Sequence, residues 1–531
     1  MKEKRERLSD WMQWSDPIDV RRRSALAMRN VFEMADPRFN HVTYIGASLS
    51  ENPPHFVHHR LGWTEALPYS VVGAVIGRKI TQEVGDEKVV AGQRSLLLSH
   101  FTGMDGFVHS PASPWSAPYP MDIWEQARTL YALIYWFGET GEERLLDYAE
   151  AMVDGLFKLS VPRGSERVFP ANSFARCSMG PYGVGAIIDP LLWYYQMSGN
   201  HKALMVGIGT AEFFMDPANG FFDEQWGAKG FFRSVVACLN GFSKAAAVTG
   251  DPRILSRAKC LHDAAVSRCT AYGSTPCGEP ACSDFELNGS ALSLVQAGYP
   301  EYWDQIDRFI RNQTARSQFI DPNEYDSEKA SKKRVNLYNI YDGYPDDLQV
   351  LPFDDYRDVV NRSVGGAMWC SPSGHSFFPA SLMICCTSHV LRSFEIAWDH
   401  SLYETNTGLV SDLQFSVDNA LGTIVSHEPK EGRAVFTFAK DTESLRIRIP
   451  SFADVGKVAL SKNGESVPTR IERGYLVADR LSKGCAYDFT FPLAERESVE
   501  WQQLFEFPDY DHPAATGEYR VQWRGNSCVL L

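Results

Sequence analysis

The sequence predicts a mainly α-helical protein with a C-terminal β part, built as an (α/α)6 toroid followed by a β-sandwich. Three observations support this prediction. Helical hairpins recur along the first part, the two helices of each hairpin differ in apolar pattern, and alternation with period two begins near residue 405. The 531 residues allow several domains. We expect a helical barrel at 1–404 and a sandwich at 405–531.

The repeat consists of a helix, a short turn that contains glycine, and a second helix. The turn glycines are Gly85, Gly141, Gly199, Gly250 and Gly298, spaced 56, 58, 51 and 48 residues apart. Glycine adopts the left-handed conformation that closes a last helical turn. The Asp, Glu or Asn that follows four of these glycines accepts the first amides of the next helix.

The two helices of a hairpin have different apolar patterns. The helix before a turn is apolar on most faces, as in 124–137, which predicts a buried inner helix. The helix after a turn carries one apolar stripe, as in 145–153, which is typical of an outer helix. About six such pairs describe a toroid, and an irregular helical bundle is the alternative.

The last part of the chain has the pattern of antiparallel strands. Residues 445–449 alternate cleanly, and Asn463-Gly464 and Arg473-Gly474 are turn pairs between such runs. The segment at about 318–365 is charged and rich in Asp and Tyr. We expect it to cross the mouth of the barrel as a long excursion.

Composition excludes several classes of function. The chain has 52 basic and 66 acidic residues, a net charge of −14, and no basic block that would serve nucleic-acid binding. No run approaches the 18 apolar residues of a membrane span. The N-terminal MKEKRERLSDW lacks the apolar region of a secretory signal, and eleven cysteines then suit reduced thiols. We expect a cytoplasmic protein, and a homo-oligomer is compatible with the sequence.

Two segments concentrate groups with metal-binding chemistry, 277–286 and 385–392. Each precedes or opens the first helix of a hairpin, so both are expected at the face opposite the Gly turns. Zinc takes thiolate and carboxylate ligands tetrahedrally, and a helix N-terminus favours thiolate. The candidate ligands are Cys282, Cys385, Cys386, Glu279 and Glu286. The alternative is that Cys385 and Cys386 are small buried hydrophobic residues.

Several motifs resemble the glycoside hydrolase family 127 superfamily, whose best-known members are β-L-arabinofuranosidases. Cys385-Cys386-Thr-Ser-His389-Val-Leu-Arg392 is similar to the family's Cys-Cys-Pro-Pro-Asn-x-x-Arg. Residues 445–450 are similar to its LRIPxW strand, and Asn463-Gly464 with Gly474-Tyr475 to its NG…GY hairpin. Residues 302–312 look like its YaDxxErxxxN helix.

The resemblance implies roles for the cysteines and glutamates. Cys385 corresponds to the nucleophile and Cys386 to a zinc ligand, and the family completes the site with a Glu-x-Cys ligand pair and a separate Glu acid/base. Gly278-Glu279 looks like the acid/base segment. Two placements of the ligand pair stay open. Glu286 lacks the following Cys, whereas Glu279-Pro-Ala-Cys282 has one residue inserted and would leave the acid/base elsewhere.

The segments that hold the sugar in the family are only partly present in this sequence. The family's Tyr-x-x-His-Lys appears as Tyr182-Gly-Val-Gly185-Ala186, and its Gly-Gly-Met-Asn-Glu ends as Asn240-Gly241, so a His and a Glu that hold the sugar are absent. These departures argue against L-arabinofuranose as the substrate. His58 and His59 either line a sugar pocket or lie in a solvated loop. The substrate-binding candidates are His58, His59, Tyr182, Asn240 and His389.

These features together predict a retaining glycoside hydrolase that acts on short oligosaccharides. A zinc-bound Cys385 thiolate attacks the anomeric carbon, and a Glu serves as acid and then as base. A thiolate-rich site selects Zn²⁺ over Mg²⁺ or Ca²⁺. The alternatives are a lyase or epimerase on the same toroid, and a sugar-binding protein without catalysis. Product analysis distinguishes the first alternative and zinc analysis the second.

Overall fold

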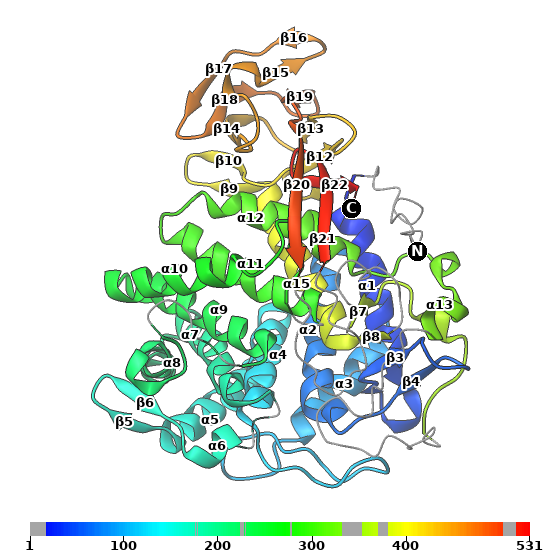
Figure 1. The fold of residues 1–531 in the computed structure, drawn as a ribbon, viewed down its shortest axis with the longest axis vertical. Helices are drawn as coiled ribbons and strands as arrows, with labels where there is room; N and C mark the ends of the chain where they lie inside the picture. Colours follow the sequence, from blue (N-terminus) through cyan, green and yellow to red (C-terminus); the bar gives the residue numbers. More distant parts are fainter. Residues whose placement is uncertain are drawn as a thin grey trace.

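A computed structural model describes residues 17–175, 177, 179–223, 228, 230–276, 279–331, 353–369, 381–502 and 517–530. Figure 1 shows a helical body with most of the C-terminal strands gathered at one end. Cys277, Gly278 and residues 332–352 of the predicted excursion lie outside the described residues.

Within the described residues, six largely buried helices form an inner ring. They are α2 (Leu67–Thr81), α4 (Ile123–Thr140), α7 (Ile188–Ser198), α9 (Phe232–Thr249), α11 (Pro280–Gln296) and α15 (Ile384–Ser401). Each helix packs against the next, and α15 packs against α2, which closes the ring. The predicted toroid is confirmed.

An outer layer of helices covers this ring. It consists of α1 (Val20–Glu33), α3 (Glu87–Ser99), α5 (Arg144–Leu159), α8 (His201–Met215), α10 (Pro252–Val266) and α12 (Tyr302–Phe309). Five of the pairs are the hairpins expected from the sequence. The sixth pairs α1 with α15, so the two ends of the helical part meet.

The predicted glycine turns end three inner helices. Gly141, Gly199 and Gly250 follow α4, α7 and α9 with φ of 67°, 71° and 64°, in the left-handed region. The Asn200 and Asp251 side chains then accept the first amides of α8 and α10. The turns therefore lie on one face of the ring, and the N-terminal ends of the inner helices lie on the other.

A small antiparallel sheet fixes the start of α15. Its strands are β4 (His55–Val57), β3 (Gly46–Ser48), β8 (Ser381–Met383) and β7 (Ala367–Met368), in that order. β8 runs directly into α15, where the Ile384 amide donates to the Ile45 carbonyl at 3.1 Å. The sheet thus joins segments more than 300 residues apart and positions the residues that open α15.

The C-terminal part contains two larger sheets, as expected. One has the order β17 (Thr469–Glu472), β18 (Tyr475–Leu481), β14 (Thr442–Arg448), β10 (Gly408–Ser411) and β9 (Tyr403–Thr405). The other has the order β11 (Val417–Asn419), β12 (Gly422–Ser426), β13 (Arg433–Phe438), β19 (Ala486–Thr490), β15 (Ala459–Lys462) and β16 (Glu465–Ser466). β10 and β14 pair in parallel, contrary to the predicted antiparallel arrangement, because the connection between them crosses to the other sheet.

A third sheet returns from this end along the helical body (Figure 1). It contains β20 (Glu495–Gln502), β21 (Gly517–Arg524) and β22 (Ser527–Leu530). Asn312, in the π-turn that follows α12, donates to the Asn526 carbonyl and accepts from the Cys528 amide, both at 2.8 Å. Asp304 of α12 pairs with Arg448 of β14 at 2.9 Å. The segment 302–312 therefore holds the strands against the barrel.

Several shorter elements connect these layers, besides a few single-turn helices. They are β1 (Ala35–Asp36), β2 (Val42–Thr43), the π-turn η3 (Gly62–Ala66), β5 (Val161–Arg163), β6 (Glu166–Val168), α6 (Ala171–Ala175), the 3-10 helix η4 (Pro181–Ile187), α13 (Ser327–Ser331) and α14 (Val359–Arg362). Across these described ranges, no helix is both long enough and apolar enough to span a membrane.

Candidate active site

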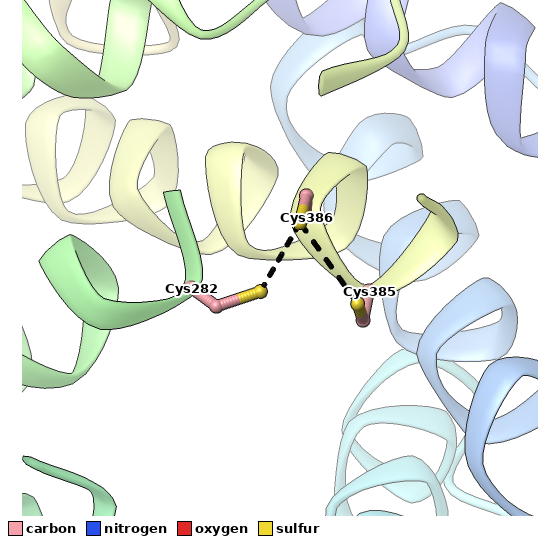
Figure 2. A group of neighbouring side chains, drawn as sticks. All are labelled: Cys282, Cys385 and Cys386. Carbon is pink, nitrogen blue, oxygen red and sulfur yellow. Dashed lines mark hydrogen bonds between the residues drawn. The ribbon is translucent and has the colours of Figure 1, made fainter. Parts of the chain in front are cut away.

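The N-terminal ends of the inner helices bring three thiols together. Cys282 lies in the first turn of α11, and Cys385 and Cys386 lie in the first turn of α15 (Figure 2). Their sulfur atoms all lie within 4.8 Å of one another, with 3.5 Å from Cys282 to Cys386 and 4.0 Å from Cys385 to Cys386. Thiolates at about 2.3 Å from a tetrahedral zinc stand about 3.8 Å apart. The three cysteines could therefore hold a metal ion.

The three thiols are buried and electrostatically linked. Burial alone raises the pKa of Cys282, but hydrogen bonds from Cys385 and Cys386 outweigh it and lower that pKa. The Cys282 partner in turn raises the pKa of Cys385, and burial raises the pKa of Cys386. Without a metal, the cluster thus favours ionisation of Cys282 over that of Cys385 and Cys386. A bound metal ion would favour ionisation of all three thiols.

Glu279 lies beside the thiols but outside their group. It immediately precedes α11, and the indole N–H of Trp369 donates to its Oε1 at 2.9 Å. Its Oε2 lies 3.8 Å from Nε of Arg233. Trp369 is itself held by its amide, which donates to the Ser381 carbonyl at 3.0 Å. The small sheet therefore sets the orientation of this carboxylate as well as the start of α15.

Glu286 lies one helical turn after Cys282 and is not part of the thiol group. Its Oε1 accepts from Arg233 at 3.0 Å, and its Oε2 accepts from Asn240 at 2.8 Å. Burial alone raises its pKa, but the nearby arginines outweigh burial and lower it. In this structure Glu286, which the sequence suggested as a zinc ligand, accepts hydrogen bonds from Arg233 and Asn240.

His389 connects the thiols to this network. Its Nδ1–H donates to the Cys385 carbonyl at 2.6 Å, and burial lowers its pKa, so the imidazole is neutral with a bare Nε2. That nitrogen lies 3.2 Å from Arg233 and 3.8 Å from Glu286. Of the predicted sugar-binding residues, Asn240 and His389 therefore lie at the base of the site.

The other predicted sugar-binding residues are held elsewhere. His58 is buried, stacks on Trp115 at 3.9 Å and contacts Asp36 at 2.9 Å, which rules out a solvated loop. His59 is buried, and its Nδ1 accepts the Leu61 amide. The Tyr182 hydroxyl donates to the Phe221 carbonyl. None of these contacts of His58, His59 and Tyr182 involves Cys282, Cys385 or Cys386.

Several residues at this mouth were not found from the sequence. Arg233, Arg128 and Trp369 are buried single residues with no spacing signature, so the sequence offers no signal for them. Glu65 in η3 and Glu125 in α4 are also buried, and burial raises the pKa of Glu65 to about 7 and that of Glu125 well above its usual range.

A cavity of about 640 Å³ has lining residues that contact Arg60 and Thr64. Tyr119, one of its lining residues, lies 4.0 Å beneath the guanidinium of Arg60. Arg60 in turn lies 3.3 Å from Glu125. Ser110, another lining residue, shares a 2.8 Å hydrogen bond with Thr64. Tyr119 and Arg60 thus connect the wall of this cavity to Glu125.

Comparison with known proteins agrees with this picture. Residues 157–321 match the family model of the β-L-arabinofuranosidase GH127 catalytic domain. No curated protein matches the chain. A solved glycoside hydrolase is 15% identical with a TM-score of 0.56, over 87% of this chain and 76% of its own.

Two solved GH127 enzymes also share the fold. A GH127 β-arabinofuranosidase is 13% identical with a TM-score of 0.59, over 97% of this chain and 84% of its own. A GH127 β-L-arabinofuranosidase from Geobacillus stearothermophilus T6 is 15% identical with a TM-score of 0.51, over 98% and 82%. Residues 157–321 are thus similar to the GH127 catalytic domain, and the chain shares the fold of two solved GH127 enzymes.

Proposed function

We propose that the protein is a retaining glycoside hydrolase for short oligosaccharides, with Cys385 as a zinc-bound thiolate nucleophile and Glu279 as the acid/base. The observation that carries the proposal is the group of three buried thiols within 4.8 Å of one another. Cys282, Cys385 and Cys386 would hold the zinc. The bound ion would keep the thiols deprotonated at neutral pH.

The position of Glu279 favours the acid/base role over the ligand role. Its carboxylate lies outside the thiol group, and Trp369 holds one of its oxygens at 2.9 Å. In the first step the Cys385 sulfur bonds to the anomeric carbon while the bond to the leaving oxygen breaks, and Glu279 protonates that oxygen. In the second step Glu279 takes a proton from water, whose oxygen displaces the sulfur. Two displacements retain the configuration.

The test uses a panel of aryl furanosides and pyranosides with zinc-loaded protein. Cys385→Ser should abolish turnover, because a serine hydroxyl stays protonated. Cys238→Ser is the matched control, since Cys238 is also buried but bonds to the Tyr182 carbonyl. It should remain active. Full activity of Cys385→Ser on any glycoside that the wild type cleaves would overturn the proposed mechanism.

A second variant separates the two roles of Glu279. General acid help is worth roughly 10²–10⁴-fold and matters little for an activated leaving group. Glu279→Gln should therefore slow glycosides with poor leaving groups far more than activated ones, with unchanged zinc content. Equal losses on both substrates, together with lost zinc, would assign Glu279 as a ligand instead.

A further inference from the structure

Arg128 is a buried cation without a hydrogen bond. It lies in the second turn of α4 and is 1% exposed, and among the described residues none of its three guanidinium nitrogens has a hydrogen-bond partner. The guanidinium lies 3.8 Å over the ring of Trp124. Burying a charged group without hydrogen bonds is costly, so such a group calls for an acceptor from a ligand.

The neighbouring carboxylate does not supply that acceptor. The Arg128 side chain points from α4 toward Glu286 on α11. Its Nη1 lies 3.7 Å from Oε1 of Glu286, which is too far for a hydrogen bond. Both oxygens of Glu286 already accept hydrogen bonds, one from Arg233 and the other from Asn240. The protein therefore satisfies Arg233 and leaves the N–H groups of Arg128 open.

The surroundings indicate the chemistry of the missing partner. Trp124 covers one face of the guanidinium, and the rings of Tyr69 and Tyr131 lie 5.6 and 5.7 Å from it. The N–H groups along its edge are the part left for a ligand. A planar edge with paired donors matches a carboxylate, which accepts two parallel hydrogen bonds.

We propose that Arg128 binds the carboxylate of a uronic acid residue in the substrate. This inference rests on the proposed function, because it assigns the acidic sugar to the site of the cysteine nucleophile. The absence of the family's sugar-holding His and Glu near Tyr182 and Asn240 agrees with a different sugar.

The first experiment measures binding without catalysis. Titration calorimetry compares D-glucuronate with D-glucose, and D-galacturonate with D-galactose, on the zinc-loaded wild type. At least one uronate should bind about 10²-fold more tightly than its neutral counterpart, the effect of a bidentate charge-assisted pair. Arg128→Gln should remove the difference, and Arg128→Lys should keep part of it. Thermal melting curves of both variants serve to check that they are folded.

Arg94→Gln is the matched control. Arg94 also lies over a tryptophan, at 4.8 Å from the centre of the Trp136 ring, but its NH2 already pairs with Glu139. This variant should keep the preference for the uronate. If Arg94→Gln removed the preference as Arg128→Gln does, the effect would not be specific to Arg128 and the inference would fail.

The second experiment uses matched aryl glycosides that differ only at C6. The value of kcat/KM should favour the uronide, and Arg128→Gln should lower it about 10²-fold for the uronide and little for the neutral glycoside. Uronate binding that depends on Arg128 without any turnover would refute the proposed function but not this inference. The inference is wrong if no uronate is preferred, if Arg128→Gln weakens both sugars equally, or if D-glucose 6-phosphate binds more tightly than both uronates.

Discussion

Replacing Glu286 with glutamine tests whether this carboxylate holds the base of the site together. Its Oε1 accepts from Arg233 at 3.0 Å and lies 3.7 Å from Arg128, and its Oε2 accepts from Asn240 at 2.8 Å. Glutamine has nearly the same shape. However, it removes the negative charge and turns one acceptor into an NH2 group that faces another donor.

The expected loss of unfolding free energy depends on which charged groups stay buried after the substitution. Breaking a buried ion pair by removing one partner costs about 3–5 kcal/mol. Glu279 still lies 3.8 Å from Arg233 and offsets part of the loss, so we expect the lower end, about 3 kcal/mol. That is about a 10²-fold change in the folding equilibrium. Because the pKa of Glu286 is lowered in the fold, its stabilisation is present above the unfolded value of about 4.3. It is lost as the pH falls below that value.

Urea denaturation of wild type and Glu286→Gln at pH 7 and at pH 4 provides the assay. The difference in unfolding free energy should be large at pH 7 and shrink at pH 4. Glu404→Gln is the control, because Glu404 pairs with Lys440 at the surface, with both side chains about half exposed. It should cost less than about 1 kcal/mol. If Glu286→Gln costs no more than this control, Glu286 does not have the role assigned to it.

Three further predictions follow from buried groups. Burial lowers the pKa of His262 to about 4, so stability falls as the pH drops from 6.5 toward 4. His262→Gln should reduce the loss of stability between pH 7 and pH 4.5 by about 2 kcal/mol in urea denaturation. An unchanged acid sensitivity would contradict this. Asn312→Ala leaves two buried backbone groups unpaired and should speed hydrogen exchange at 517–530, whereas wild-type exchange there would show that Asn312 does not hold those strands. Trp369→Phe removes the donor to Glu279 and should slow glycosides with poor leaving groups about tenfold at constant zinc content, and lost zinc would point to a ligand role.

The toroid was predictable because its signals are local. Gly141, Gly199 and Gly250 end inner helices in the left-handed conformation, and Asn200 and Asp251 cap the helices that follow. Closure of the ring has no local signal. α1 pairs with α15 from the other end of the helical part, and the connection that makes β10 and β14 parallel depends on the packing of two sheets.

The cysteines of the site were predictable and their surroundings were not. Cys282, Cys385 and Cys386 stand out because thiols in the first turns of helices are a chemical signal in themselves. Arg128 and Arg233 act by reaching across the barrel, from α4 toward α11 and from α9 toward α2. Those contacts exist only after the ring has closed, so the spacing of residues along the chain does not predict them.

The zinc–thiolate centre is the central claim, and zinc-edge X-ray absorption on protein purified without chelators tests it most directly. We predict about one zinc per chain with three sulfur neighbours at about 2.3 Å. Cys282→Ser should leave two sulfurs or lose the metal, because Cys282 is the thiol that α11 contributes to the group. A protein that takes up no zinc after loading, or zinc bound only by nitrogen and oxygen, would contradict the account.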